Sequence, residues 1–156
     1  MPGQSSHFDL PPKVRELRVL IVEDDEDDLL VLKEALQQSD LFWTITIALN
    51  GQEAITWLEG ELKAKRPLPD FILSDIKTPL MDGFDLLQWI RSHPQLKHLP
   101  VVFFTSSSLP ADLERARHLG ANGYQIKPTQ FVRYREIITS MDEAIRTERP
   151  YSPIGL

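Results

Sequence analysis

The stretch PDFILSDIKTPLMDG, residues 69–83, carries the strongest indication of the fold. Within it, residues 70–74 (DFILS) form a short, mostly apolar run that is typical of a strand buried in a parallel sheet. That run ends at Asp75, and a helix is predicted to follow Gly83, with an apolar side at helical spacing. The residues of this side are Phe84, Leu87 and Ile90. A strand, a loop and a helix in this order predict one unit of an α/β fold.

The same alternation continues on both sides of this stretch. Further strands are predicted at residues 17–22, 43–49, 100–104 and 122–126. Helices are predicted between and after them from apolar positions at helical spacing, namely Leu29, Leu32 and Leu36; Ala54, Trp57, Leu58 and Leu62; Leu109, Leu113 and Ala116; and Phe131, Tyr134, Ile138, Met141 and Ile145. Five strands alternating with five helices predict a parallel sheet covered on both faces. Ligands of such sheets bind beyond the carboxyl ends of the strands.

Composition limits the classes of function. The chain has 156 residues, which suits one domain, and a formal net charge of -6, which argues against a DNA-binding protein. It has no cysteine, so disulfides and thiolate zinc sites are excluded. No apolar run approaches the roughly 20 residues of a membrane helix, and the first residues lack the apolar core of a secretory signal. We therefore expect a cytoplasmic protein that binds neither DNA nor a membrane.

Polar side chains follow four of the predicted strands. Glu23 and Asp24 come after the first strand, Asp75 after the third, Thr105 ends the fourth, and Lys127 follows the fifth. Carboxylates brought together at one edge repel one another unless they share a cation, and Mg²⁺ prefers such hard oxygen ligands. A carboxylate can also act as a nucleophile toward phosphorus, while a lysine and a hydroxyl stabilise the phosphoryl oxygens. The set therefore indicates a phosphoryl-transfer site.

Four motifs in order give the chain a specific resemblance. They are VLIVEDD (19–25), PDFILSDIKTPLMDG (69–83), PVVFFTS (100–106) and GANGYQIKP (120–128). The chain resembles the receiver domain of two-component response regulators, over about residues 17–147. Residues 1–16 and 148–156 are then expected to be tails. The resemblance implies a flavodoxin-like, doubly wound sheet with strand order 2-1-3-4-5.

The resemblance also implies a role for each motif residue at the metal site. Asp75 would be the phosphoacceptor. Mg²⁺, or Mn²⁺ in its place, would be held by Asp24, by Asp75, by Glu23 through a water molecule and by the backbone carbonyl of Lys77. Glu23 stands where the family more often has aspartate, which lengthens the side chain and keeps its charge.

The remaining motif residues would bind the phosphoryl group and transmit its presence. Lys127 would pair with the acceptor carboxylate and then with the phosphoryl group, Thr105 would move its hydroxyl onto that group, and Tyr124 would follow as an aromatic switch. Loop-shaping roles fall to Pro79, Gly83 and Pro128. Asp27 and Asp28, in contrast, are expected to be ordinary surface charges at the start of a helix.

The function implied is that of a signalling switch rather than an enzyme, although such a domain promotes its own phosphorylation and dephosphorylation. A sensor histidine kinase would donate the phosphoryl group. The stretch 60–69 and the segment SHPQLKHLP (92–100) resemble those of stand-alone cyanobacterial regulators paired with phytochrome kinases, which suggests a phytochrome as that kinase. The output would be a protein contact at the face of the fourth helix, fifth strand and fifth helix, which is also the expected surface of a homodimer. Onward relay of the phosphoryl group is an alternative.

Three other classes of protein fit this pattern of residues less well. A haloacid dehalogenase-type phosphatase needs a second aspartate two residues after the nucleophile, where this chain has Lys77. An interaction module that works without phosphorylation usually lacks one of the acidic, threonine or lysine positions, all of which are present here. A flavodoxin would need a phosphate-binding loop of Ser, Thr and Gly after the first strand, where this chain has EDDEDD.

Overall fold

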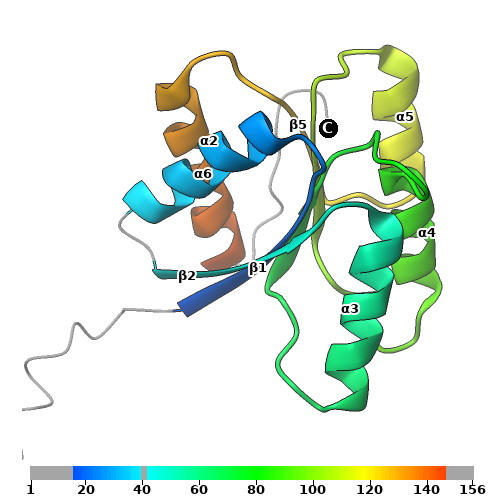
Figure 1. Cartoon of the computed structure of the whole chain (residues 1–156). Coiled ribbons are helices and arrows are strands. Elements are labelled where there is room, and N and C mark those ends of the chain that lie inside the picture. The colour runs from blue at the N-terminus through cyan, green and yellow to red at the C-terminus, as the bar shows by residue number, and fades with distance from the viewer. Residues whose placement is uncertain (1–15, 40–41, 147–156) are drawn as a thin grey trace, which may run out of the picture.

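The computed structural model describes residues 16–39 and 42–146 and shows a parallel sheet between two layers of helices (Figure 1). In these residues the strands are β1 (Glu16–Val22), β2 (Phe42–Ala48), β3 (Phe71–Ser74), β4 (Val101–Thr105) and β5 (Gly123–Ile126). The helices are α2 (Glu26–Gln38), α3 (Gly51–Lys63), α4 (Gly83–Ser92), α5 (Pro110–His118) and α6 (Phe131–Arg146).

The strands lie in the order β2-β1-β3-β4-β5, and every neighbouring pair is parallel. The predicted α/β fold and its strand order are therefore confirmed. Each strand lies within one residue of its expected bounds. The expected tails, residues 1–16 and 148–156, lie outside the described residues apart from Glu16, which begins β1.

The strands are buried on both faces because helices cover both sides of the sheet. In Figure 1, α2 and α6 lie on one side, and α3, α4 and α5 on the other. Successive side chains of a strand point to opposite faces, so Leu20 and Ile72 join the core under α3–α5, whereas Ile21 and Leu73 join the core under α2 and α6. Each such fully buried side chain contributes roughly 1.5–3 kcal/mol of transfer free energy.

Polar side chains fix the starts of three helices near the carboxyl edge of the sheet. Asp25, Asn50 and Asp82 are the N-caps of α2, α3 and α4, and each side chain accepts a hydrogen bond from a backbone N–H in the first turn. Helix α5 begins instead with Pro110, and after its end Gly120 adopts a φ of 91°, as expected for a glycine that ends a helix.

At the amino ends of the strands, opposite the carboxyl edge of the sheet, Arg91 makes several hydrogen bonds. Arg91 of α4 donates to the carbonyl oxygen of Gly120 through Nε and Nη2, at 3.1 and 2.9 Å. It also donates to the carbonyl oxygen of Leu99 at 2.8 Å and to Oδ1 of Asn122 at 2.7 Å. One guanidinium thus joins α4 to the segments that lead into β4 and β5.

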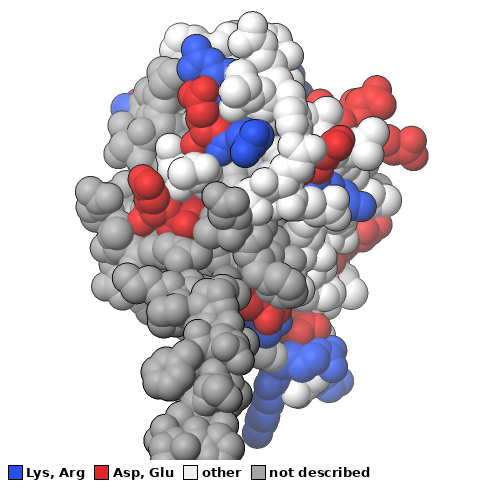
Figure 2. Space-filling view, turned by 90° about the vertical axis from the view of Figure 1, so that its left-hand side faces the viewer, with Lys and Arg blue, Asp and Glu red and all other residues white. Residues whose placement is uncertain are grey.

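The surface is charged and mixed. On the α2 and α6 side of the molecule, acidic and basic side chains of the described residues are interspersed with uncharged ones (Figure 2). None of the helices in the described part of the chain combines the length and apolar character needed to cross a membrane.

Candidate functional site

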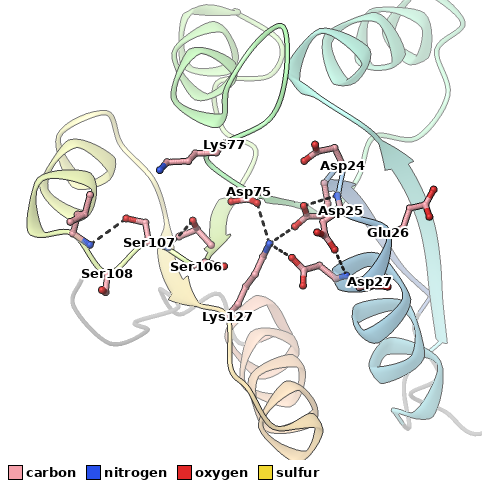
Figure 3. A pocket seen from close by; sticks show the side chains of 14 residues that line it. Asp24, Asp25, Glu26, Asp27, Asp75, Lys77, Ser106, Ser107, Ser108 and Lys127 are labelled. Atoms are coloured by element: carbon pink, nitrogen blue, oxygen red, sulfur yellow. Dashed lines mark hydrogen bonds and ion pairs between the residues drawn. The ribbon is translucent and has the colours of Figure 1, made fainter.

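The carboxyl ends of β1, β3, β4 and β5 meet at a pocket of about 860 Å³, here called the acidic pocket. It is lined by residues 23–28, Asp75, Lys77, residues 105–109 and Lys127. All the strand-end residues predicted from the sequence, Glu23, Asp24, Asp75, Thr105 and Lys127, therefore converge on one place (Figure 3).

Backbone hydrogen bonds continue past the strand ends and hold these residues in position. The N–H of Glu23 donates to the carbonyl oxygen of Ala48 at 3.0 Å, and that of Asp75 donates to Val22 at 2.9 Å. The N–H of Lys127 donates to the carbonyl oxygen of Thr105 at 2.7 Å. The functional side chains thus project from backbone that is as well fixed as the sheet itself.

The ammonium group of Lys127 lies at the centre of the acidic pocket. Its Nζ is 2.6 Å from Glu23 Oε1, 2.7 Å from Asp28 Oδ2 and 3.1 Å from Asp75 Oδ2 (Figure 3). Only 8% of the Lys127 side chain is exposed, so this is a largely desolvated cation shared by three carboxylates. The expected pairing of Lys127 with the carboxylate of Asp75 is present in the structure.

Burial and neighbouring charges act in opposite directions on the pKa values of both Glu23 and Lys127. Burial raises the pKa of Glu23, and the hydrogen bonds from Lys127 and from the Asp25 amide only partly offset this. Burial would lower the pKa of Lys127, but hydrogen bonds to Asp28 and Glu23 and the charge of Asp75 outweigh it, so this pKa is raised. Lys127 is therefore protonated, because three carboxylates stabilise its ammonium. Each carboxylate, in contrast, is stabilised by an ammonium that it shares with two others.

The sequence-based expectation that Asp28 is an ordinary surface charge is wrong. Its carboxylate makes one of the two shortest contacts of Lys127, whereas Asp27 is exposed and does not contact Lys127. The pattern did contain a signal for this. Asp28 precedes Leu32 by four residues, and Ala35 and Leu36 continue the same buried face, so Asp28 extends that face by one turn toward the pocket.

The loop after Asp75 is shaped by tight backbone contacts. Asp75 Oδ1 accepts from the N–H of Ile76 at 2.7 Å, and the carbonyl oxygen of Ile76 accepts from Gly83 at 2.7 Å. A Cβ on Gly83 would lie 2.4 Å from the carbonyl oxygen of Asp75, so only glycine fits there. Between them, Leu80 follows Pro79 with a φ of 67° and is 89% exposed.

Lys77 belongs to this loop but not to the charged cluster. Its side chain is exposed and projects away from the ammonium of Lys127 (Figure 3). No peptide bond in the described residues is cis, so the bond between Lys127 and Pro128 is trans.

Thr105 and Tyr124 are joined by the loop after β4. Both side chains are buried, each with 2% of its surface exposed. Thr105 Oγ1 accepts from the N–H of Ser107 at 3.2 Å, and the Tyr124 hydroxyl donates to the carbonyl oxygen of Ser107 at 2.9 Å. The Ser107 hydroxyl in turn donates to Asp112 of α5 at 2.5 Å. One residue therefore links the pocket, the aromatic side chain and the next helix.

The donor set fits a magnesium ion that retains water. In the described residues no group of three His, Cys, Asp or Glu side chains is arranged to hold a metal ion, and Lys127 contacts Glu23, Asp28 and Asp75 instead. Mg²⁺ does not require such a cage, since it commonly binds one or two carboxylates and keeps several water molecules. Asp24 is exposed and lines the acidic pocket together with Asp75, and Lys127 does not contact it (Figure 3).

Comparisons with known proteins agree with this geometry. A sequence model of the response regulator receiver domain matches residues 19–139. The polar-differentiation response regulator DivK of Brucella anthropi is 33% identical over 122 residues, which are 78% of this chain and 93% of that protein.

Solved structures of similar proteins extend over most of the chain. The phosphorylated cyanobacterial phytochrome response regulator RcpA has a TM-score of 0.77 at 29% identity and covers 86% of this chain and 96% of its own. The Mn²⁺-bound form of response regulator Rcp1 has a TM-score of 0.72 at 29% identity, with 79% and 92% covered. The bacteriophytochrome response regulator RtBRR has a TM-score of 0.68 at 34% identity, with 80% and 77% covered.

Proposed function

The chain belongs to the response regulator receiver domain family, and on that basis we propose that Asp75 accepts a phosphoryl group from a sensor histidine kinase. The observation that carries this proposal is the position of the Asp75 carboxylate, which lies at the end of β3 and 3.1 Å from a buried ammonium. The phosphorylated domain would then change its contacts with other proteins in the cytoplasm.

The chain's own residues supply the parts of the transfer. A carboxylate oxygen of Asp75 attacks phosphorus, an O–P bond forms, and the P–N bond to the kinase histidine breaks, with the electron pair returning to the imidazole. Lys127 neutralises the charge on the phosphoryl oxygens, because its ammonium is already held beside Asp75. Thr105 has a hydroxyl at the pocket wall that can donate to the same oxygens.

A divalent cation, Mg²⁺ or Mn²⁺, completes the proposed site. Asp24, Asp75 and the backbone carbonyl of Lys77 would hold it directly, and Glu23 through a water molecule. When bound, the ion supplies positive charge that neutralises the phosphoryl oxygens. The buried Glu23 stays near it because its carboxylate also accepts from Lys127 and from the N–H of Asp25.

Tyr124 and Ser107 are proposed to carry the signal outward. A hydroxyl of Thr105 that turns toward the phosphoryl group would release the N–H of Ser107, to which it is now bonded. Because the carbonyl of Ser107 accepts from Tyr124, the loop and the ring would move together. The added charge of about -1.5 to -2 is large enough to bias such a loop between two arrangements.

The test is chemical phosphorylation followed by intact mass. The purified chain is incubated with acetyl phosphate and Mg²⁺, and the attack of Asp75 on phosphorus releases acetate. We expect the mass of one phosphoryl group to be added, no addition in EDTA and none in Asp75→Asn. An unmodified wild-type chain under all conditions would instead favour an interaction module that works without phosphorylation.

A phytochrome is proposed as the kinase partner. Two of the similar structures described above are named as phytochrome or bacteriophytochrome response regulators. We expect an autophosphorylated phytochrome kinase to transfer its label to the wild-type chain and not to Asp75→Asn. If that kinase labels its own regulator but leaves this chain unlabelled, the pairing is wrong, and the phosphoacceptor role is untouched.

The face formed by α5, β5 and α6 is proposed as the output and dimer surface. It carries exposed apolar side chains, among them Leu109 (57% exposed), Ile126 (38%) and Val132 (56%). Sedimentation analysis with and without acetyl phosphate tests this proposal, and Ile126→Asp is expected to lower the dimer fraction. A chain that remains monomeric in both conditions would rule out the dimer.

A further inference from the structure

The contacts of the Lys127 ammonium are unequal. An ammonium group has three N–H donors, and here each meets a different carboxylate. The distances to Glu23 and Asp28, 2.6 and 2.7 Å, are those of strong charge-assisted hydrogen bonds. The distance to Asp75 is 3.1 Å, so Lys127 is held more closely by Glu23 and by Asp28 of α2 than by the acceptor.

Asp28 differs from Glu23 in its access to water. The Asp28 side chain is 36% exposed, whereas that of Glu23 is 5% exposed. The backbone of Asp28 is fixed independently of this contact, because its N–H donates to the capping carboxylate of Asp25 at 2.9 Å. The Asp28 carboxylate can therefore separate from Lys127 and be solvated at modest cost, while Glu23 cannot.

A phosphoryl group on Asp75 creates a competition for this ammonium. Its oxygens carry about -1.5 to -2 charges and need donors, yet only the N–H of Lys127 that now meets Asp75 faces them, because the other two are held by Glu23 and Asp28. One of these two contacts has to lengthen for a second N–H of Lys127 to reach the phosphoryl group. Since Asp28 is the partner that water can most readily solvate, the contact of Asp28 is the one that yields.

We propose that Asp28 is a positioning residue that competes with the phosphoryl-bearing Asp75 for the Lys127 ammonium. This competition lowers the stability of the phosphorylated state relative to the free one. This inference rests on the proposed function. Removing the carboxylate of Asp28 leaves Glu23 to hold the lysine and frees one N–H for the phosphoryl oxygens. The phosphorylated state should then be favoured relative to the free one.

The test measures the affinity for beryllofluoride, a phosphoryl mimic, in saturating Mg²⁺. Asp28→Asn keeps the shape of the side chain and the capped backbone, and we expect it to bind beryllofluoride about threefold to tenfold more tightly. Asp27→Asn is the matched control, because it removes the same charge one residue away. The Asp27 side chain makes no hydrogen bond or ion pair within the part of the chain that the structure describes. Asp28→Glu restores the charge and should return the affinity toward that of the wild type.

A second readout does not depend on the phosphoryl mimic. In lysine-labelled protein without beryllofluoride, the ¹H–¹⁵N signal of the Lys127 ammonium should shift and exchange faster in Asp28→Asn but not in Asp27→Asn. Equal affinities for Asp28→Asn and Asp27→Asn, or weaker binding by Asp28→Asn alone, would overturn the competition. A wild-type chain that binds no beryllofluoride would overturn the proposed function and this inference with it, even if the ammonium signal reports the contact with Asp28.

Discussion

Two glycine-to-alanine substitutions should have opposite effects on stability. Gly83 begins α4 and is buried, and a Cβ placed there would lie 2.4 Å from the carbonyl oxygen of Asp75 and 3.0 Å from the Cα of Ile76. Gly60 lies inside α3 on its exposed side, with no atom within 4 Å of an added Cβ. The same methyl group therefore meets backbone at one position and open space at the other.

The magnitudes follow from these surroundings. Overpacking typically costs about 1–3 kcal/mol, and the upper end applies to Gly83→Ala because the obstructing backbone atoms cannot rotate away. Gly60→Ala should instead raise the free energy of unfolding by roughly 0.5–1 kcal/mol, since alanine loses less backbone entropy in a helix. The two variants should thus differ by about 3–4 kcal/mol.

Urea denaturation followed by far-ultraviolet circular dichroism measures both effects. We expect the midpoint to fall for Gly83→Ala and to rise for Gly60→Ala, with unchanged slopes. Because the clash is with the carbonyl of Asp75, Gly83→Ala should also slow phosphorylation by acetyl phosphate. A Gly83→Ala variant as stable as the wild type would refute the account of the loop after β3.

Substitutions at three further residues probe other contacts. Lys127→Met leaves three carboxylates without a cation, so the free energy of unfolding measured in EDTA should fall by roughly 3 kcal/mol. Mg²⁺ should restore part of this loss, and no response to Mg²⁺ would contradict the prediction. Tyr124→Phe loses the bond to Ser107 and should cost about 1 kcal/mol. Burial raises the pKa of Tyr124 above that of the unfolded chain, so this group's stabilisation is present below pH ~10 and is lost as pH rises further. Denaturation series at rising pH should therefore show a smaller alkaline loss for Tyr124→Phe, and an equal loss would contradict it. Arg91→Ala should cost about 2–3 kcal/mol in urea, and Arg91→Lys should recover little; full recovery would contradict a role for the guanidinium fork.

The fold could be predicted because its signals are local. Each strand is a short apolar run, since a parallel sheet buries both faces, and each run is followed by a helix with one apolar side. The strand bounds differ from the expected ones by one residue, because hydrogen bonding at a strand end depends on the neighbouring strand. Phe131 shows the limit of the pattern. It continues the apolar stripe of α6 in sequence, yet it begins the helix and is 38% exposed.

The site was predictable to the extent that each residue ends a strand. Asp75, Thr105 and Lys127 each occupy such a position, and parallel strands bring those positions to one edge. The role of Asp28 was missed because it lies in the first turn of a helix among other acidic residues. Acidic side chains are favoured there by the helix dipole, so an aspartate at this position does not by itself indicate a binding partner. Its contact with Lys127 joins residues that are 99 positions apart in the chain, and local spacing does not report such a pair.

The most direct test of the central claim is to locate the phosphorylated side chain among the many carboxylates of the acidic pocket. After incubation with acetyl phosphate and Mg²⁺, borohydride reduces an acyl phosphate to an alcohol, and tandem mass spectrometry identifies the residue. The account predicts homoserine in place of Asp75 and unchanged carboxylates at Glu23, Asp24 and Asp28. Reduction at one of those residues, with Asp75 intact, would contradict it.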